Sequence, residues 1–282
     1  PSDLERASTR MDKLSLDDEQ AMERMLAKAE TPQERAYLMK ALAAGHSVDE
    51  IGKFQDKIHG KDPSWMRWHL TPVVTAGDSM DDEGLESDGA NTNTDRVTFR
   101  GQQWTQGPEG TCVASSTVTS RAMVDPVYAL QLTGGPDGQQ DDPEAFKQRL
   151  VAEQHRLHTE GDGGEKWTGM GPEGQERIND NSVGKATGTD YQRQDLNSAD
   201  DRRAVLTEVQ RSVAQGHPVP VDVSGKDGAH AMTIIAQEGD MLQVYNPWGT
   251  TTWVSEDDFI NGRMGKASNN ELPNAYSVYL PR

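Results

Sequence analysis

The sequence predicts an α+β fold in which helices come first and an antiparallel sheet follows. Two patterns support this prediction. Helix start signals and apolar residues at helical spacing fill residues 12–70, and short apolar segments separated by turns fill the end of the chain. The 282 residues suffice for one large domain with a smaller one, and the 33% of hydrophobic residues indicates a modest core.

The first 75 residues are expected to form a helical unit. Ser15, Thr31 and Ser47 each precede a segment with acidic residues in its first turn and apolar residues at helical spacing. The side-chain oxygens of serine and threonine accept hydrogen bonds from the free N–H groups at a helix start. We therefore predict about three helices within residues 1–75.

A change of composition separates this unit from the rest of the chain. Residues 76–95 are acidic, rich in Gly and nearly free of apolar side chains, which predicts a linker. Residues 96–282 are expected to form the main domain. Within it we predict helices over residues 112–124, 143–158 and 198–215, a Gly-rich loop over residues 159–175, and strands over residues 97–99, 219–223, 229–237, 241–246, 250–254 and 275–280.

The charge balance narrows the choice of partners. The formal net charge is −18. An acidic surface repels the phosphates of nucleic acids and the headgroups of anionic lipids, so we expect neither as a partner. No signal peptide is recognisable, and no apolar run reaches the roughly 20 residues that span a membrane. The compartment is left open.

The only cysteine, Cys112, lies where a reactive thiol is expected. A lone cysteine excludes an internal disulfide. It follows a turn rich in Gly and Pro at the predicted start of a helix, where free N–H groups and the helix dipole favour a thiolate. The backbone N–H of Cys112 and the side-chain amide of Gln106 are candidate donors to an oxyanion. Considered by itself, a single cysteine is more often a buried structural residue.

Among the seven histidines, His230 is the strongest candidate for a general base. It opens an apolar strand over residues 229–235, where a polar ring needs a hydrogen-bond partner. His155 and His158 lie on a charged helix and are expected to be solvated. The others are expected in turns, at helix ends or in packing positions.

Strand geometry suggests a partner for His230. If residues 238–240 form a three-residue hairpin turn, Met232 lies opposite Asn246 and His230 lies opposite Trp248. All four side chains then share one face of the hairpin, because side chains alternate along a strand. Asn246 becomes a diagonal neighbour of His230, about 7 Å away between Cα atoms. We predict that Asn246 orients the imidazole and that Trp248 shields the pair.

These motifs together resemble those of the papain-like cysteine peptidases. The order of the motifs matches that family: Gln-Gly-x-x-Gly-x-Cys before a helix, then a histidine that opens a strand, then Asn-Pro-Trp-Gly. Calpains have similar motif sequences. The resemblance implies a papain-like fold, in which a helical subdomain that carries the cysteine packs on an antiparallel sheet that carries the histidine and asparagine. It also implies the site residues: Cys112 as nucleophile, His230 as general base, Asn246 as its orienting partner, Gln106 as oxyanion donor, and Trp248 and Gly110 as residues that shape the site.

The resemblance extends over residues 97–280 and includes departures. Thr111 stands where the family has Asp or Ser, and Val113 replaces the aromatic residue that commonly follows the nucleophile, so substrate preference does not carry over. The compact layout also resembles papain-like domains of bacterial effectors and toxins. The absence of disulfides suits a reducing cytosol, including a host cytosol reached by a delivered effector.

Three functions fit these features. The first is a cysteine peptidase that acts on a protein or peptide through an acyl-enzyme. The second is an amidase, deamidase or transglutaminase-like acyl transferase with the same triad. The third is a catalytically silent binding module, which the complete set of site residues disfavours.

No cofactor is needed for this chemistry. Calcium is only weakly indicated, because the spacing of Asp137, Asp141, Asp142 and Asp162 fits no EF-hand loop. The N-terminal helices are expected to serve as a buttress or docking unit. An inhibitory pro-segment, released by cleavage in the acidic linker, is the alternative.

Overall fold

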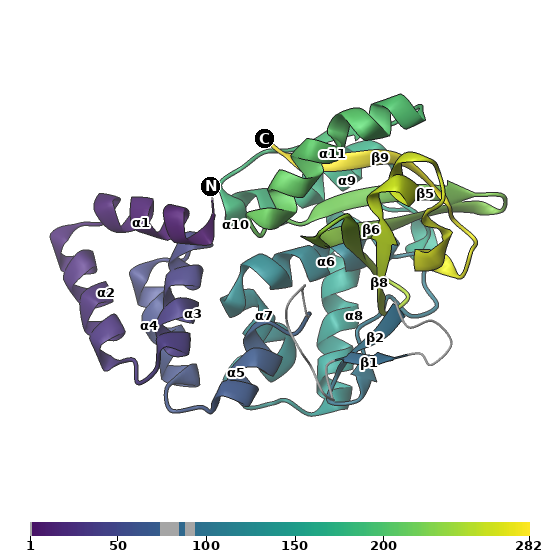
Figure 1. Ribbon diagram of the computed structural model, residues 1–282. Coiled ribbons are helices and arrows are strands. Elements are labelled where there is room, and N and C mark those ends of the chain that lie inside the picture. Colours follow the sequence, from purple (N-terminus) through teal and green to yellow (C-terminus); the bar gives the residue numbers. More distant parts are fainter. Residues whose placement is uncertain (1, 74–84, 88–93) are drawn as a thin grey trace.

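The computed structural model describes residues 2–73, 85–87 and 94–282, and it confirms the α+β prediction (Figure 1). Helices occupy the first part of the chain and an antiparallel sheet dominates the last. Five helices lie within residues 2–73: α1 (Asp3–Lys13), α2 (Leu16–Lys28), α3 (Pro32–Ala43), α4 (Val48–Ile58) and α5 (Pro63–Leu70).

The N-terminal unit therefore has two more helices than the sequence predicted. The three predicted starts are correct, since Ser15, Thr31 and Ser47 each accept a hydrogen bond from a backbone N–H three residues later. Helix α1 was missed because only two of its residues, Arg6 and Ala7, are buried, which gives almost no apolar stripe. Helix α5 was missed because it has only eight residues.

The main domain is built on one antiparallel sheet. In space the strands follow the order β1-β2-β8-β7-β6-β5-β9-β4, and β3 pairs with β2. The strands are β1 (Leu85–Ser87), β2 (Thr94–Phe99), β3 (Gln102–Gln103), β4 (Tyr191–Asp195), β5 (Val219–Gly225), β6 (Gly228–Glu238), β7 (Met241–Asn246), β8 (Thr250–Ser255) and β9 (Asn274–Pro281).

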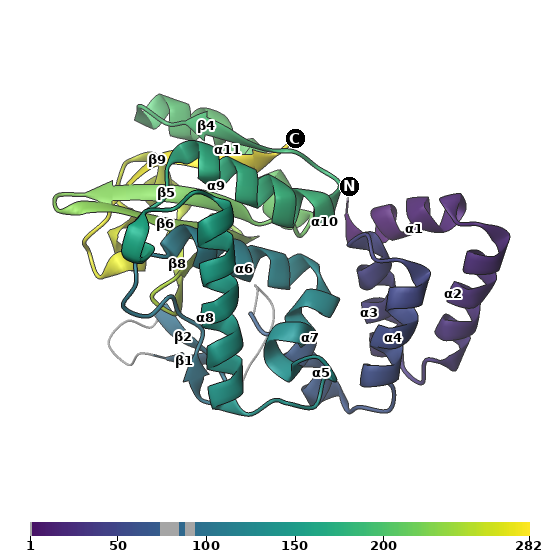
Figure 2. The same ribbon diagram turned by 180° about the vertical axis from the view of Figure 1, so that it is seen from behind.

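Helices pack on both faces of this sheet (Figures 1 and 2). Ile235 of β6 belongs to the hydrophobic core that includes Val118. Its neighbour Ile234 belongs to a second hydrophobic core, which includes Val209. Consecutive residues of a strand point to opposite faces, so this strand is buried on both sides. The helices of the main domain are α6 (Cys112–Val124), α7 (Pro126–Gly134), α8 (Pro143–Glu160), η1 (Glu165–Trp167), α9 (Pro172–Asn179), η2 (Asp180–Gly184), α10 (Lys185–Thr187), α11 (Ala199–Ala214), α12 (Glu256–Ile260) and η3 (Met264–Ser268).

Several short elements of the main domain were not predicted. Strand β4 has the sequence Tyr-Gln-Arg-Gln-Asp, in which only Tyr191 is buried and apolar. Helix α7 lacks an amphipathic pattern because seven of its nine residues are buried. Among the described helices, none combines the length and the apolar character needed to span a bilayer.

The predicted linker lies largely outside the described residues. Within residues 76–95, the described part is strand: Leu85–Ser87 pairs with β2, and Thr94 and Asp95 belong to β2 itself. Strand β2 continues into the sheet through its pairing with β8. The division into residues 1–75, 76–95 and 96–282 remains a prediction.

The hairpin between β6 and β7 contains two deviations from the predicted register that cancel. The turn has two residues, not three, since Glu238 pairs with Met241. A β-bulge between Ile234 and Ala236 then shifts the register by one residue, so that Thr233 pairs with Tyr245 as predicted. The bulge thus restores the predicted alignment at the end of the hairpin that holds His230.

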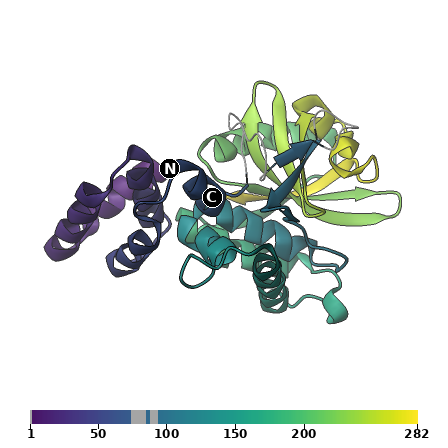
Figure 3. The same cartoon turned by 90° about the horizontal axis from the view of Figure 1, so that it is seen from below.

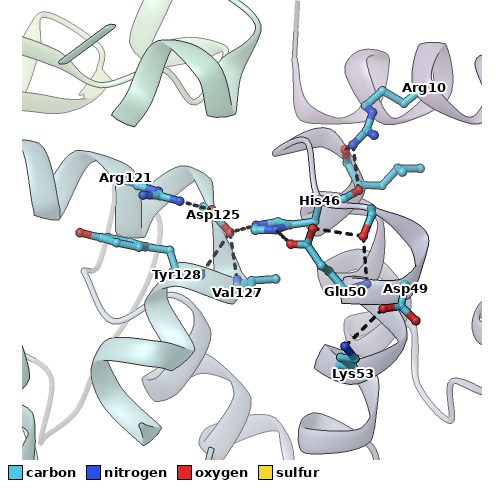
Figure 4. Close-up of polar contacts among 11 residues, drawn as sticks. Arg10, His46, Asp49, Glu50, Lys53, Arg121, Asp125, Val127 and Tyr128 are labelled. Carbon is cyan, nitrogen blue, oxygen red and sulfur yellow. Dashed lines mark hydrogen bonds and ion pairs between the residues drawn. The ribbon is translucent and has the colours of Figure 1, made fainter. Parts of the chain in front are cut away.

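Charged hydrogen bonds fasten the N-terminal unit to the main domain (Figure 4). His46, which follows α3, places Nε2 2.7 Å from Oδ1 of Asp125 and Nδ1 2.8 Å from Oε2 of Glu50. Asp125 is 1% exposed and also caps α7 by accepting hydrogen bonds from the N–H groups of Val127 and Tyr128. One imidazole therefore links α4 to the junction of α6 and α7.

A second contact joins the same unit to the region before β5. Arg6 of α1 lies with Nη1 2.7 Å from Nε2 of His217, and both side chains are buried. Ala44, at the end of α3, packs in a small core with Tyr191 and Tyr279. The unit thus contacts both the helical layer and the sheet. Figure 3 shows it at one end of the molecule, away from the β5–β6 hairpin.

Candidate active site

Cys112 is the first residue of α6, as the sequence predicted. The helix is packed on all sides, and ten of its thirteen residues are buried. Small side chains allow it to approach β6 closely, where Ser116 Oγ donates to the carbonyl oxygen of Ala231 at 3.3 Å. This packing sets the start of α6 next to the strand that carries His230.

The surroundings of the Cys112 thiol favour its protonated form. Burial raises the pKa of the thiol, and the charge of the buried Asp222 adds to this rise. Backbone N–H groups of Ala231, Val113 and Cys112 act in the opposite direction, because they favour the thiolate. The net direction is upward, so the resting sulfur is a neutral thiol surrounded by donors that stabilise it once it ionises.

His230 is held by Asn246 in the predicted contact. Nε2 of the ring lies 2.8 Å from Oδ1 of Asn246. The orientation of this amide is fixed, because Nδ2 donates to the carbonyl oxygen of Ala267 at 2.8 Å and Oδ1 accepts from the N–H of Trp248 at 2.9 Å. An amide oxygen only accepts, so Nε2 carries the proton. The basic lone pair of neutral His230 is therefore on Nδ1.

Trp248 covers the His230–Asn246 pair. The two rings stack with centroids 4.8 Å apart at an angle of 26°. Asn246 is 1% exposed and His230 is 8% exposed. Burial lowers the pKa of His230, and the hydrogen bond to Asn246 offsets only part of this effect. The imidazole is consequently neutral near pH 7 and able to accept a proton.

Gln106 lies on the turn that leads into α6. Its backbone N–H donates to the carbonyl oxygen of Pro247 at 2.7 Å, which ties the turn to the Asn-Pro-Trp-Gly segment. Its Nε2 donates one hydrogen to the carbonyl oxygen of Glu109 at 2.6 Å. A primary amide has two hydrogens, so the second remains for another acceptor.

One cleft of about 670 Å³ brings most of the predicted site residues together. Its wall is formed by residues from the turn over residues 106–111 that leads into α6 (the motif turn), the start of α6, the β5–β6 hairpin and the segment before β9. It is lined by Gln106, Gly110, Cys112, Gly169, Lys226, Asp227, Gly228, Ala229, His230, Trp248, Asn270, Glu271 and Leu272. Asn246 lies behind His230 and does not line the cleft.

Gly110 has a steric role in the motif turn. A Cβ atom at this position would lie 2.7 Å from the carbonyl oxygen of Trp167 and 3.2 Å from the backbone N of Gly169. No side chain fits there without a shift of the backbone. The glycine therefore allows residues 167–169 to pack directly on the turn, two residues before Cys112.

The four aspartates considered for calcium do not form a common site. Asp141 pairs with His69 and Arg100, and Asp162 pairs with Arg177. Asp142 caps α8 by accepting from the N–H of Ala145, and Asp137 accepts from the N–H of Gln139. Each carboxylate has a local structural partner.

The N-terminal unit does not contribute to the cleft. No residue of the described range 2–73 is among those that line it. In Figure 1 the unit lies at the opposite end of the molecule from the tip of the β5–β6 hairpin. Whether these helices serve as a buttress or docking unit, or as a pro-segment, remains a prediction.

Two histidines near the site were misjudged from the sequence. His155 and His158 were expected to be solvated, but His158 is 2% exposed and His155 is only partly exposed. Nε2 of His158 lies 3.0 Å from the carbonyl oxygen of Gly164, and the ring of His155 stacks on Trp167. The available signal was their three-residue spacing, which puts both rings on one face of α8.

The fold and the cleft define an α+β protein with a cysteine, a histidine and an asparagine gathered at one site. A helix that begins with the cysteine packs on an antiparallel sheet that carries the histidine and asparagine, which is the arrangement that the papain-like resemblance implied.

The chain matches no known family model and no curated protein. Among solved structures it is similar to the crystal structure of the Pseudomonas avirulence protein AvrPphB. The identity is 12% and the TM-score is 0.31, and the match covers 64% of this chain and 95% of that chain. We therefore base the function on the residues of this chain alone.

Proposed function

We propose that this protein is a cysteine hydrolase that cleaves peptide bonds through an acyl-enzyme intermediate. One observation carries the proposal: Cys112 and His230 line the same cleft, and a fixed Asn246 leaves the basic nitrogen of His230 on Nδ1. A thiol beside a neutral, oriented imidazole is the minimal set for nucleophilic catalysis by cysteine.

The first step forms the acyl-enzyme. Nδ1 of His230 takes the thiol proton, and the sulfur of Cys112 attacks the substrate carbonyl to form a C–S bond. The negative charge that develops on the carbonyl oxygen is stabilised by the backbone N–H of Cys112 and the second amide hydrogen of Gln106. His230 then protonates the leaving nitrogen as the C–N bond breaks.

The second step releases the product. A water molecule gives a proton to His230 and attacks the thioester, and the C–S bond breaks as the thiol of Cys112 is restored. Throughout the cycle, the amide of Asn246 keeps the ring of His230 in one orientation, because its own partners, Ala267 and Trp248, are backbone groups.

The test compares proteome digests made by the unmodified protein and by Cys112→Ala. New N-termini that appear only with the unmodified protein would support the peptidase. Deamidated or cross-linked side chains would assign the same site to amidase or acyl-transfer chemistry on side-chain amides. If neither product appears and iodoacetamide does not label Cys112 under reducing conditions, the catalytic proposal is wrong.

A further inference from the structure

A hydrogen bond between side chains joins helix α8 to the motif turn. Nε2 of His155 lies 2.6 Å from Oε2 of Glu109, which stands three residues before Cys112. The carbonyl oxygen of the same Glu109 accepts the hydrogen bond from the amide of Gln106. A change at His155 is thus transmitted through one residue to the side chain proposed as the oxyanion donor.

His155 is in turn held by an unusual loop. The indole of Trp167 stacks on its ring with centroids 3.6 Å apart and an angle of 2°. Trp167 and Lys166 both have positive φ values, 59° and 55°. Bulky residues rarely adopt this left-handed conformation, and such positions persist only where the surrounding contacts enforce them.

The loop that contains these two residues packs next to the motif turn. Residues 164–169 form a closed loop, in which the N–H of Gly164 donates to the carbonyl oxygen of Gly169 at 2.9 Å. The carbonyl oxygen of Trp167 packs against Gly110, and Gly169 lines the cleft. The loop therefore packs against His155 on one side and against the motif turn on another.

We propose that His155, held by Trp167, is a positioning residue that sets the oxyanion hole by fixing Glu109 and, through it, the amide of Gln106. The inference rests on the proposed function, since it assigns a role within that site. His155 does not line the cleft and touches no reacting atom. Its effect is therefore confined to steps in which an oxyanion forms.

This confinement permits a test that needs no knowledge of the natural substrate. Acylation of Cys112 by p-nitrophenyl acetate passes through a tetrahedral oxyanion, whereas alkylation by iodoacetamide does not. We expect His155→Ala to slow acylation about tenfold and to change alkylation by less than about twofold. Removal of the donor itself in Gln106→Ala is expected to slow acylation about 100-fold.

The double variant Gln106→Ala/His155→Ala distinguishes positioning from an independent role. Because His155 acts through Gln106, the double variant should acylate no more slowly than Gln106→Ala alone. A further tenfold loss in the double variant would overturn the inference. So would an equal loss of acylation and alkylation in His155→Ala, since that result indicates general damage to the site.

Two other variants complete the design. Arg156→Ala, next to His155 but exposed and paired with Glu153 and Glu160 of the same helix, should match the unmodified protein in both reactions. Glu109→Gln keeps an acceptor for His155 and should retain most of the acylation rate, whereas Glu109→Ala should lose it. If His155→Ala does not fold, the comparison of Glu109→Gln with Glu109→Ala still tests the contact between His155 and Glu109.

Failure of the inference and failure of the proposed function give different results. If the unmodified protein is not acylated at Cys112, the acyl-transfer function is wrong and the positioning role is wrong with it. If the unmodified protein is acylated and His155→Ala reacts equally fast, the function stands and only the role of His155 is overturned.

Discussion

Two histidines in this protein, His230 in the cleft and His46 at the N-terminal interface, are held in opposite charge states. His230 has an amide partner, and burial lowers its pKa. His46 lies between the carboxylates of Asp125 and Glu50. Burial opposes a charge on His46 as well, but the hydrogen bonds and charges of its two partners outweigh burial and raise its pKa.

The difference shows how a partner decides what an imidazole can do. An amide oxygen orients the ring without stabilising its charge, so His230 remains a base. Two carboxylates accept from both ring nitrogens, so His46 is a cation that fastens one unit to another. Arg121, 3.6 Å from the second oxygen of Asp125, shares that carboxylate and places a second positive charge beside it.

The largest expected effect is on catalysis, and it distinguishes the role of His230 from that of His46. His230→Ala should lower the steady-state hydrolysis of p-nitrophenyl acetate by about 10²- to 10⁴-fold, because the thiol loses its general base. His46→Ala is the matched control and should leave this rate unchanged, since His46 does not line the cleft. A comparable loss in both variants would show that the two histidines do not have separate roles.

A second variant gives His230 the kind of partner that His46 has. Asn246→Asp places a carboxylate beside the ring and should raise the pKa of His230 by about one to three units. The acidic limb of the pH–rate profile should move upward by the same amount, and Asn246→Ala should lower the rate without that movement. A limb that stays in place in Asn246→Asp would contradict the electrostatic explanation.

The contribution of His46 to the stability of the protein should decrease as pH rises, because its pKa is raised in the folded state. A raised pKa in the folded state gives stability that is complete below about pH 6.5, the unfolded value, and is lost as pH rises through the folded pKa. We expect His46→Ala to lower the free energy of unfolding by about 2 kcal/mol at pH 6 and by clearly less at pH 9.

Chemical denaturation at both pH values measures this effect. Glu50→Gln is the weaker companion change, because the side chain of Glu50 is 56% exposed and its pair with His46 is screened by water. An equal loss of stability at pH 6 and pH 9 in His46→Ala would contradict a charged His46.

The smallest expected effect concerns the resting state of the thiol. Because burial and Asp222 raise the pKa of Cys112, its alkylation by iodoacetamide should speed up steadily as pH rises through 9. A preformed thiolate–imidazolium pair would instead give a rate that is already maximal and constant near pH 7. The pH profile of alkylation separates these two states.

The sequence predicted the fold class and the contact of His230 with Asn246, and it missed several short elements around them. The helix starting at Cys112 was predicted correctly because a Gly- and Pro-rich turn marks its start. The contact of His230 with Asn246 was found although the turn was wrong, since the bulge near Ile235 corrected the register. A bulge has no reliable local signal, because long-range packing on both faces of β6 decides it.

The supporting contacts could not be predicted because their partners are far apart in sequence. Asn246 depends on the carbonyl oxygen of Ala267, which follows from the path of η3. The burial of His155 depends on Trp167, a residue in a left-handed loop conformation that no periodicity indicates. Such contacts belong to the tertiary structure and leave no pattern in a single segment.

The most direct test of the central claim is a time course of the intact mass of the unmodified protein after mixing with p-nitrophenyl acetate. We expect one acetyl group to appear on Cys112 and then to disappear as water hydrolyses the thioester. The formation rate should fall as His230 is protonated, at a pH below about 6.5. Absence of the acetyl group from Cys112, or an adduct that forms equally fast in His230→Ala, would contradict the account.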